Sequence, residues 1–418
     1  MKRRELLTAG ASIIGSTFAP SKLFAATEAQ QKCIFVFAQG GWDPTRVFAA
    51  EFSNPQVAME SNAGLSQVGN IQWVSHDTRP SVDDFFQQFY QDSLIINGLQ
   101  IRSISHEICT TIAYTGGVSG STSDWGTTIA AHSNQSLAIP HLVLGGPNFS
   151  GAYPAYVVQT GGNNSLSLLL DGSIQERSNI SVPSLSEQTR SLIDQHIQAR
   201  VHAKALNATH GMDHYLSQIY KESFDNALLL KNKRHVMDFA TGTNLNSQIQ
   251  TAVDSLCKGI SRCCSIAFTG SNGLGWDTHA DNDETQANLY QNLFSSLNHL
   301  MDQLHRTPDQ DGTLLSDTTT VVVFSEMGRS PQLNATDGKD HWPFSSALIW
   351  SKACTGNRMI GSFSSNYQGM GIDLQSGEID DSAAILGIES LGAALLASAD
   401  IDPAEYILDA DPLWGILR

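Results

Sequence analysis

The sequence predicts an α/β protein with a mostly parallel central sheet and helices on both faces. Short apolar runs that end in glycine or polar turns recur along the chain, as in "KCIFVFAQGG" (32–41), and such runs are typical of buried parallel strands. Strand-like and helix-like segments alternate for most of the chain, which favours this architecture. The clearest amphipathic helix is expected over 283–307, where one side carries Leu289, Leu293, Leu297, Leu300 and Leu304.

The length and composition allow one large domain or two. The chain has 418 residues, of which 41% are hydrophobic and 16% charged, so it can build a sizeable core. We predict a single domain over 30–418, with a helical insertion near 184–241. Two long helical patterns with scattered charge lie in that stretch, "SEQTRSLIDQHIQARVHAKAL" and "GMDHYLSQIYKESFDNALLLKN".

The charge balance excludes some classes of partner. A formal net charge of -17 argues against binding to nucleic acid or to an anionic membrane surface. A small anionic substrate stays compatible with this charge, because a bound cation reverses the local field. Nothing in the sequence sets the oligomeric state.

The N-terminus predicts export. Residues 1–29 begin with Lys2, Arg3 and Arg4, continue through a mildly apolar stretch and end in small residues. The paired arginines followed by Leu6 and Leu7 resemble a twin-arginine signal, so the twin-arginine translocase is the expected export partner. A short amphipathic helix is the alternative. The mature protein is therefore expected to be periplasmic or secreted.

The chain has six cysteines and no CxxC pair, so a zinc knuckle or a thioredoxin-type site is not expected. An oxidising compartment permits disulfides. Cys257 paired with Cys263 or Cys264 is the most plausible local bridge. Cys33 lies in a strand-like run and is expected to be a buried thiol.

Polar side chains follow several predicted strands, at the edge where ligands bind in parallel sheets. The first strand leads through "GGWD", the second leads to "SH", and a third leads to "GWDTH". A fourth ends in "SE" and is followed by "GKDHWP". We expect these residues to converge on one site: Asp43, Ser105, His106, Asp277, His279, Glu326, Asp340 and His341.

Carboxylates and imidazoles together favour a divalent metal such as zinc, manganese or iron. Each residue also has a simpler interpretation. An Asp in a glycine turn is usually a turn former, and Ser105 can be a helix cap. Glu326 can pair with Arg329 three residues later. The coincidence of five such loops favours a shared site.

Several of these motifs together resemble one known family. The twin-arginine start, "GGWD", "SH", "GWDTH" and "SEMGRSPQLN...GKDHWP" resemble exported bacterial proteins catalogued as domain of unknown function 1501. That family is grouped with the alkaline phosphatase and sulfatase superfamily. The resemblance covers most of the mature chain and implies an alkaline-phosphatase-like fold.

The resemblance also implies roles for the metal-site residues. Asp43 would be the metal ligand of the first strand, and Asp277 and His279 would bind one metal, completed by His341 or Asp340. Glu326 would stand at the strand end where the superfamily places an adjacent Asp-His pair. The superfamily's wider Asp-to-His spacing is not kept, because one residue separates Asp277 from His279. One metal, an altered site and no metal all remain compatible with this pattern.

The same resemblance places catalytic residues. Ser105 would lie near the nucleophile position at a helix start, and Arg329 would hold an oxygen of the phosphate or sulfate. The residues leave open whether Ser105, His106 or Thr110 is the nucleophile, and whether His106 is itself a ligand. The implied function is metal-dependent hydrolysis of a phosphate or sulfate ester. The alternative is a non-catalytic exported binding or assembly protein that keeps the fold without an intact metal site.

Overall fold

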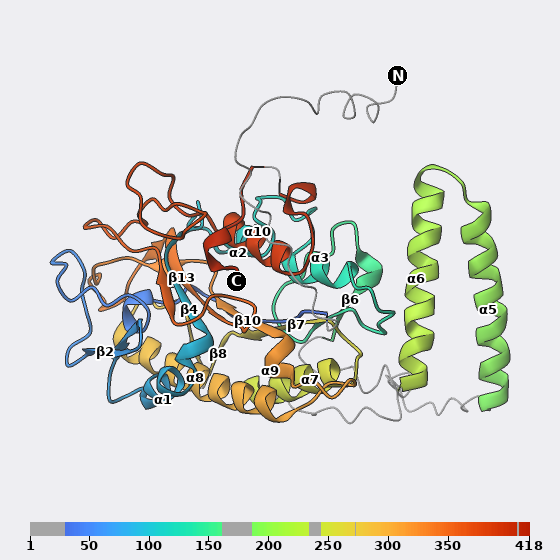
Figure 1. Cartoon of the computed structure of the whole chain (residues 1–418), viewed down its shortest axis with the longest axis horizontal. Helices are drawn as coiled ribbons and strands as arrows, with labels where there is room; N and C mark the ends of the chain where they lie inside the picture. The colour runs from blue at the N-terminus through green and yellow to red at the C-terminus, as the bar shows by residue number, and fades with distance from the viewer. Residues whose placement is uncertain (1–29, 161–185, 234–243, 272, 408) are drawn as a thin grey trace, which may run out of the picture. The chain divides into compact units, whose positions relative to one another are not determined.

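An eight-stranded sheet forms the centre of the protein in a computed structural model, which describes residues 30–160, 186–233, 244–271, 273–407 and 409–418 (Figure 1). Residues Gln31–Arg418 form one compact unit. The strands follow the order β14 (Arg358–Ile360), β4 (Ser93–Gln100), β13 (Phe344–Trp350), β10 (Thr319–Phe324), β1 (Lys32–Ala38), β7 (Cys263–Phe268), β5 (His141–Val143) and β6 (Val157–Gln159).

The sheet is mostly parallel, as the sequence predicts. β1 pairs in parallel with β10 and β7, and β5 is parallel to β7 and β6. β13 is the exception, because it runs antiparallel to both β10 and β4. The central position of β1 brings the ends of β1, β7 and β10 to one edge, and the loops that follow them carry most of the predicted site residues.

Helices cover both faces of the sheet, which explains why its central strands are apolar throughout. α2 (His106–Thr115), α3 (Trp125–Ala131) and α10 (Ile388–Ser398) lie on one side (Figure 1). α1 (Pro80–Phe89), α7 (Leu245–Cys257) and α8 (Asn282–Arg306) lie on the other. Successive side chains of β1 alternate between two cores: Ile34 and Val36 enter the core beneath α8, and Phe35 and Phe37 enter the core beneath α2.

The amphipathic helix expected over 283–307 is α8. All five leucines predicted to form its apolar side are buried in the core. The helix starts at Asn282, three residues after "GWDTH" (275–279), so its packing fixes the end of that loop.

Shorter elements complete the described chain. Three two-stranded sheets are formed by β2 (Gly64–Val68) with β3 (Ile71–Ser75), β8 (Gly270–Ser271) with β9 (Leu274–Gly275), and β11 (Gly328–Arg329) with β12 (His341–Trp342). A four-residue helix, α9 (Leu315–Thr318), precedes β10. Single 3-10 turns are found at Pro44–Arg46, Tyr90–Asp92, Pro154–Tyr156, Pro403–Glu405 and Trp414–Ile416.

The region of the predicted insertion contains two long helices, α5 (Glu187–Asn207) and α6 (Gly211–Lys233), which pack against each other. Residues 184–185 and 234–241 of that stretch lie outside the described residues, and so does the predicted signal at 1–29. None of the described helices combines the length and the apolar character needed to cross a membrane.

The local disulfide predicted from the cysteine spacing is wrong, because all six cysteines are free. Cys263 and Cys264 are adjacent residues of β7, so their side chains enter opposite cores. Cys257 ends α7, and its thiol donates a hydrogen bond to the Asp254 carbonyl at 3.4 Å. Burial raises the pKa of the Cys264 thiol.

Candidate metal centre

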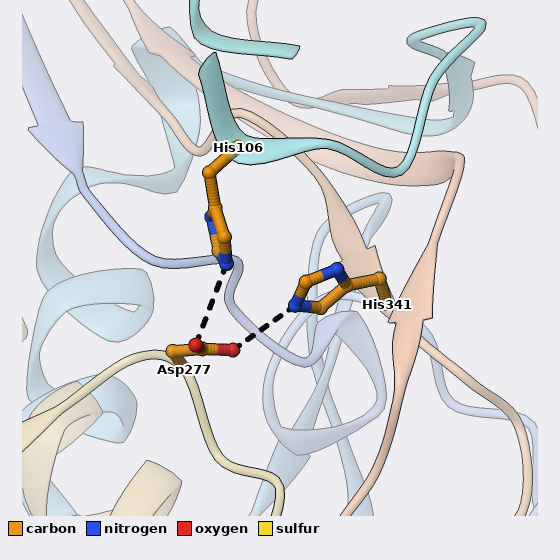
Figure 2. Close-up of side chains that lie close together, drawn as sticks. All are labelled: His106, Asp277 and His341. Atoms are coloured by element: carbon orange, nitrogen blue, oxygen red, sulfur yellow. Dashed lines mark hydrogen bonds and ion pairs between the residues drawn. The ribbon is translucent and has the colours of Figure 1, made fainter. Parts of the chain in front are cut away.

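Three side chains from separate loops point toward one another at the edge of the sheet. Figure 2 shows His106, Asp277 and His341 in this arrangement. His106 is the first residue of α2, Asp277 follows β7 and β9, and His341 begins β12. Nε2 of His341 lies 3.2 Å from Oδ1 of Asp277, and Nε2 of His106 lies 3.4 Å from Oδ2. Their potential ligand atoms all fall within 4.8 Å of one another.

His279 brings a third imidazole to the same carboxylate. Its Nε2 lies 3.1 Å from Oδ1 of Asp277 and 3.0 Å from Nε2 of His341. The two Asp/His pairs of the sequence therefore meet, although more than sixty residues separate them. Asp340, the remaining member of these pairs, faces the other side of the His279 ring, with Oδ1 3.1 Å from Nδ1.

Each of the three rings is oriented through its Nδ1 atom. Nδ1 of His106 lies 2.9 Å from a carboxylate oxygen of Glu326, and Nδ1 of His341 lies 2.7 Å from the Ile104 carbonyl. These partners are acceptors, as is Asp340, so each Nδ1 donates. In the neutral rings every Nε2 then carries a lone pair directed at the Asp277 carboxylate. A carboxylate or carbonyl that fixes the ring in this way is typical of metal-binding histidines.

The donor set fits a divalent cation. Nε2 of His106 is buried and has no hydrogen-bond partner among the described residues. Nitrogen lone pairs and a carboxylate that face one another repel unless a positive charge lies between them. Three imidazoles and one carboxylate suit zinc, manganese or iron. His106, Asp277 and His341 therefore have ligand atoms close enough together to share one ion, and His279 adjoins Asp277 and His341.

Arg329 holds the Asp277 carboxylate in place. Its side chain is fully buried, and it donates to Oδ1 of Asp277 at 2.7 Å and to the carbonyls of Gly41 at 2.8 Å, Lys339 at 3.2 Å and Gly40. Burial opposes ionisation of Asp277, but the hydrogen bond and charge of Arg329 outweigh it, and the pKa falls to about 2. The role expected for Arg329, holding an oxygen of the substrate, does not agree with this burial.

Glu326 lies behind the cluster. Its two carboxylate oxygens accept from the backbone N–H of Gly40 at 2.8 and 3.0 Å, and one also accepts from the Ser325 hydroxyl at 3.1 Å. The remaining contact is to His106, whose pKa is raised chiefly by this hydrogen bond, against the effect of burial. Glu326 thus orients the His106 ring and is not in the group whose ligand atoms converge, in contrast to its expected role as a metal ligand.

Position 40, the first residue of "GGWD", requires glycine for a steric reason. Gly40 has φ of +129°, and a Cβ there would lie 2.9 Å from the backbone nitrogen of Asp277. Only glycine allows the β1 loop to approach the Asp277 loop this closely. The same residue donates its N–H to Glu326, so the close approach also fixes the carboxylate behind His106.

Asp43 is not part of the cluster, which corrects its expected role as a metal ligand. It is fully buried, and Oδ2 lies 2.8 Å from the Lys339 ammonium and 3.3 Å from Nε of Arg46, and it accepts from Asn282 at 2.9 Å. Oδ1 accepts from both the backbone and the hydroxyl of Thr45. Burial acts to raise the pKa of Asp43, but Lys339 and Arg46 lower it overall. Both oxygens are already satisfied by groups of the chain itself.

The family identity rests on the sequence between residues 30 and 350, which matches the model described as "Protein of unknown function (DUF1501)". The chain belongs to this family. The match covers more than half of the chain and spans every residue of the proposed cluster. No curated protein is significantly similar to the chain in sequence.

Several solved structures resemble this DUF1501 protein weakly. A protein in the alkaline phosphatase superfamily from Vibrio parahaemolyticus has a TM-score of 0.38 and 11% identity, with 89% of this chain and 67% of that chain covered. The lipoteichoic acid synthase LtaP from Listeria monocytogenes has 0.36 and 9%, with 93% and 76% covered. The PsFucS1 sulfatase from Pseudoalteromonas sp. has 0.33 and 10%, with 94% and 72% covered. Likenesses of this strength carry no conclusion about chemistry.

A cavity of about 840 Å³ opens beside the cluster of the DUF1501 protein. α2 supplies one wall, because His106, Glu107, Thr110 and Thr111 lie on one face of the helix at spacings of one and four residues. Ser105 precedes the helix, is exposed, makes no side-chain capping bond and is not among the residues that line the cavity.

Neither Lys339 nor the cavity wall that contains Glu107 and Thr111 was predicted from the sequence. Lys339 is the residue before the Asp-His pair of "GKDHWP", but only the fold brings it to Asp43. The spacing in the sequence could have predicted this wall. Glu107 and Thr111 are four residues apart in a predicted helix that begins with a candidate site residue, so they lie on one face of it.

Proposed function

We propose that this protein binds one divalent cation with His106, Asp277, His279 and His341 and hydrolyses a phosphate or sulfate ester in the adjoining cavity. One observation supports this most directly. Three imidazoles have Nδ1 engaged with acceptors, and their Nε2 atoms surround a single carboxylate. This arrangement is typical of metal-binding side chains and not of side chains that only stabilise the fold.

A bound divalent cation would act as a Lewis acid toward an ester oxygen in the cavity. The chain supplies the rest. Arg329 keeps Asp277 ionised and holds its carboxylate in place, and Glu326 and Asp340 fix the planes of two ligand rings. The backbone N–H of Gly40 holds the Glu326 carboxylate, so the orientation of the His106 ring exists before substrate arrives.

Thr110 is the hydroxyl best placed to face the substrate. It lines the cavity one helical turn after His106, whereas Ser105 does not line it. His106 is engaged as a ligand in this proposal, so it is not the nucleophile. Thr110→Val removes the hydroxyl at nearly constant volume, and Ser105→Ala is the matched control. Loss of turnover in the first variant alone would support Thr110, and the reverse result would restore Ser105.

The N-terminal sequence supports export as part of this proposal. A twin-arginine-type signal at 1–29 would bring the folded protein to the periplasm or the exterior through the twin-arginine translocase. Fusion of these residues to a reporter, with Arg3→Lys and Arg4→Lys as the control, tests it. Export that persists in the double substitution would contradict the assignment.

The metal content of the purified protein tests the central claim. We expect about one zinc, manganese or iron ion per chain, and less than a tenth of that in Asp277→Ala and His279→Ala, because each change removes a ligand. His76→Ala, a histidine outside the cluster, should retain the ion. Turnover of bis-p-nitrophenyl phosphate or p-nitrophenyl sulfate should disappear with a chelator and return with metal. A folded protein without bound metal, whose melting temperature ignores chelators, would instead favour a non-catalytic binding or assembly role.

A further inference from the structure

The cavity beside the metal centre has an unusual charge for a site that receives an anion. Its described lining residues include no lysine or arginine, and the charged ones are acidic: Glu107, Asp277 and Glu326. His106 is the remaining titratable group in the wall. Sites that bind phosphate dianions usually present arginine, lysine or several free backbone N–H groups to the phosphate oxygens. This wall offers no such side chain.

The nearest buried cations are already engaged. Arg329 has no exposed surface, and its donors reach three backbone carbonyls and Asp277. Lys339 is buried against Asp43 and donates to the hydroxyl of Thr45 at 3.1 Å. Neither cation lines the cavity. A substrate in the cavity would therefore meet the positive charge of a bound metal and no free cationic side chain.

Glu107 adds a negative charge to the same α2 wall that carries His106. It is exposed in the first turn of α2, and its carboxylate makes no hydrogen bond or ion pair with the described residues. With a divalent ion present, its two positive charges and that of Arg329 meet four negative charges, on Asp277, Glu326, Glu107 and Asp340. The local balance is then one negative charge, so each further negative charge on a ligand is bound less favourably than the first.

We propose that the cavity selects esters with a single negative charge, namely sulfate monoesters or phosphate diesters, over doubly charged phosphate monoesters, with Glu107 as a specificity-determining residue. This inference rests on the proposed function. The free carboxylate of Glu107 also favours a leaving group that donates hydrogen bonds, such as a sugar hydroxyl or an amine. The neighbouring hydroxyls of Thr110 and Thr111 extend the same polar wall.

Binding to the metal-loaded protein tests the inference without requiring turnover. Calorimetric titration with phenyl sulfate, methyl phenyl phosphate and phenyl phosphate at pH 8 compares two monoanions with a dianion of similar size. We expect each monoanion to bind about tenfold more tightly than phenyl phosphate. The two monoanions separate sulfate from phosphate diester as the preferred class. Tighter binding of phenyl phosphate, or binding of none of the three, would overturn the proposal.

Glu107→Gln tests the role of the Glu107 charge in this selectivity. Removing one negative charge should strengthen binding of phenyl phosphate severalfold more than that of phenyl sulfate, because the dianion gains twice as much from it. Glu405→Gln removes an exposed carboxylate outside the cavity and should leave the ratio unchanged. An unchanged ratio in Glu107→Gln would reject its role. A protein that shows this selectivity in binding but turns over no ester would reject the hydrolase function and retain the charge selectivity.

Discussion

Nε2 of His279 lies 3.0 Å from Nε2 of His341, while Nδ1 of each ring is held by an acceptor on the opposite side. Two neutral imidazoles in this arrangement cannot hydrogen-bond to each other, because both Nε2 atoms carry lone pairs. A shared cation removes the conflict. A metal ion bound as proposed would thus link two loops that are distant in sequence.

The acceptors behind the rings should set metal affinity. Glu326→Ala removes the partner of His106, and Asp340→Ala removes the exposed partner of His279. Each is expected to weaken metal binding about 10- to 100-fold, because the ligand ring loses its fixed orientation. Competition with a chromophoric chelator measures the affinity. Glu378→Ala, which removes a carboxylate paired with Arg358, is the control, and an affinity equal to wild type in both site variants would contradict the assignment.

The buried pair of Asp43 and Lys339 should be strongly coupled. Lys339→Met leaves the Asp43 carboxylate buried with Arg46 as its one remaining cation among the described residues, and we expect a loss of about 3–5 kcal/mol in the free energy of unfolding. Urea denaturation measures it. Asp43→Asn combined with Lys339→Met removes both charges and should recover much of the loss. If the double variant is as unstable as the sum of the single variants, packing and not charge explains the effect.

His141 should make stability depend on pH. The ring is fully buried, with Nδ1 2.9 Å from the Thr127 hydroxyl and Nε2 2.8 Å from that of Ser265. Burial lowers its pKa, against the opposing charge of Asp124. The unfolded chain therefore binds the proton more readily, so this contribution is complete above about pH 6.5 and is lost as the pH falls below it.

Unfolding free energies measured between pH 5 and 8 for wild type and His141→Gln isolate this contribution. The wild-type value should fall more steeply on acidification than that of the variant, because only wild type carries the titrating ring. Parallel curves would show that His141 does not titrate differently in the folded and unfolded states.

Gly40→Ala should damage both the fold and the metal centre. The added methyl group meets the Asp277 backbone at 2.9 Å, and φ of +129° is unfavourable for alanine. We expect destabilisation of at least about 1–3 kcal/mol and weaker metal binding, since the Asp277 loop must move. Gly117→Ala is the matched control, because nothing lies within 4 Å of a Cβ at that position. Wild-type metal affinity in Gly40→Ala would show that the close approach is dispensable for the site.

The central strands of the sheet could be predicted from the sequence, because the apolar pattern that indicates a buried strand is local. Continuous apolar runs such as 32–38 and 320–324 become central strands, since only a strand covered on both faces is apolar throughout. The antiparallel direction of β13 was not predicted, because direction depends on the connection and not on the apolar pattern. The disulfide prediction failed for a related reason: proximity in sequence between Cys257 and Cys263 says nothing about which core each thiol enters.

The candidate site was predicted as a set of residues and only partly as a set of roles. Asp277, His279 and His341 lie close together, because each follows a strand of the central sheet, and their role as ligands stays a prediction. Glu326 and Asp340 are the same types of residue in the same loops, yet they lie one layer further out. Distances of a few ångströms separate a ligand from its support, and spacing along the chain does not resolve them.

Lys339 is a cation that no chelator can remove. The charge of Asp43, in the loop after β1, is neutralised as soon as the chain folds, whereas the ion proposed for the histidine cluster would come from outside. Folding and the proposed metal loading would thereby be separable in time, and a metal-depleted protein would keep an intact sheet edge next to the proposed ligands. The ion finally held would then depend on which metals surround the folded protein when loading occurs.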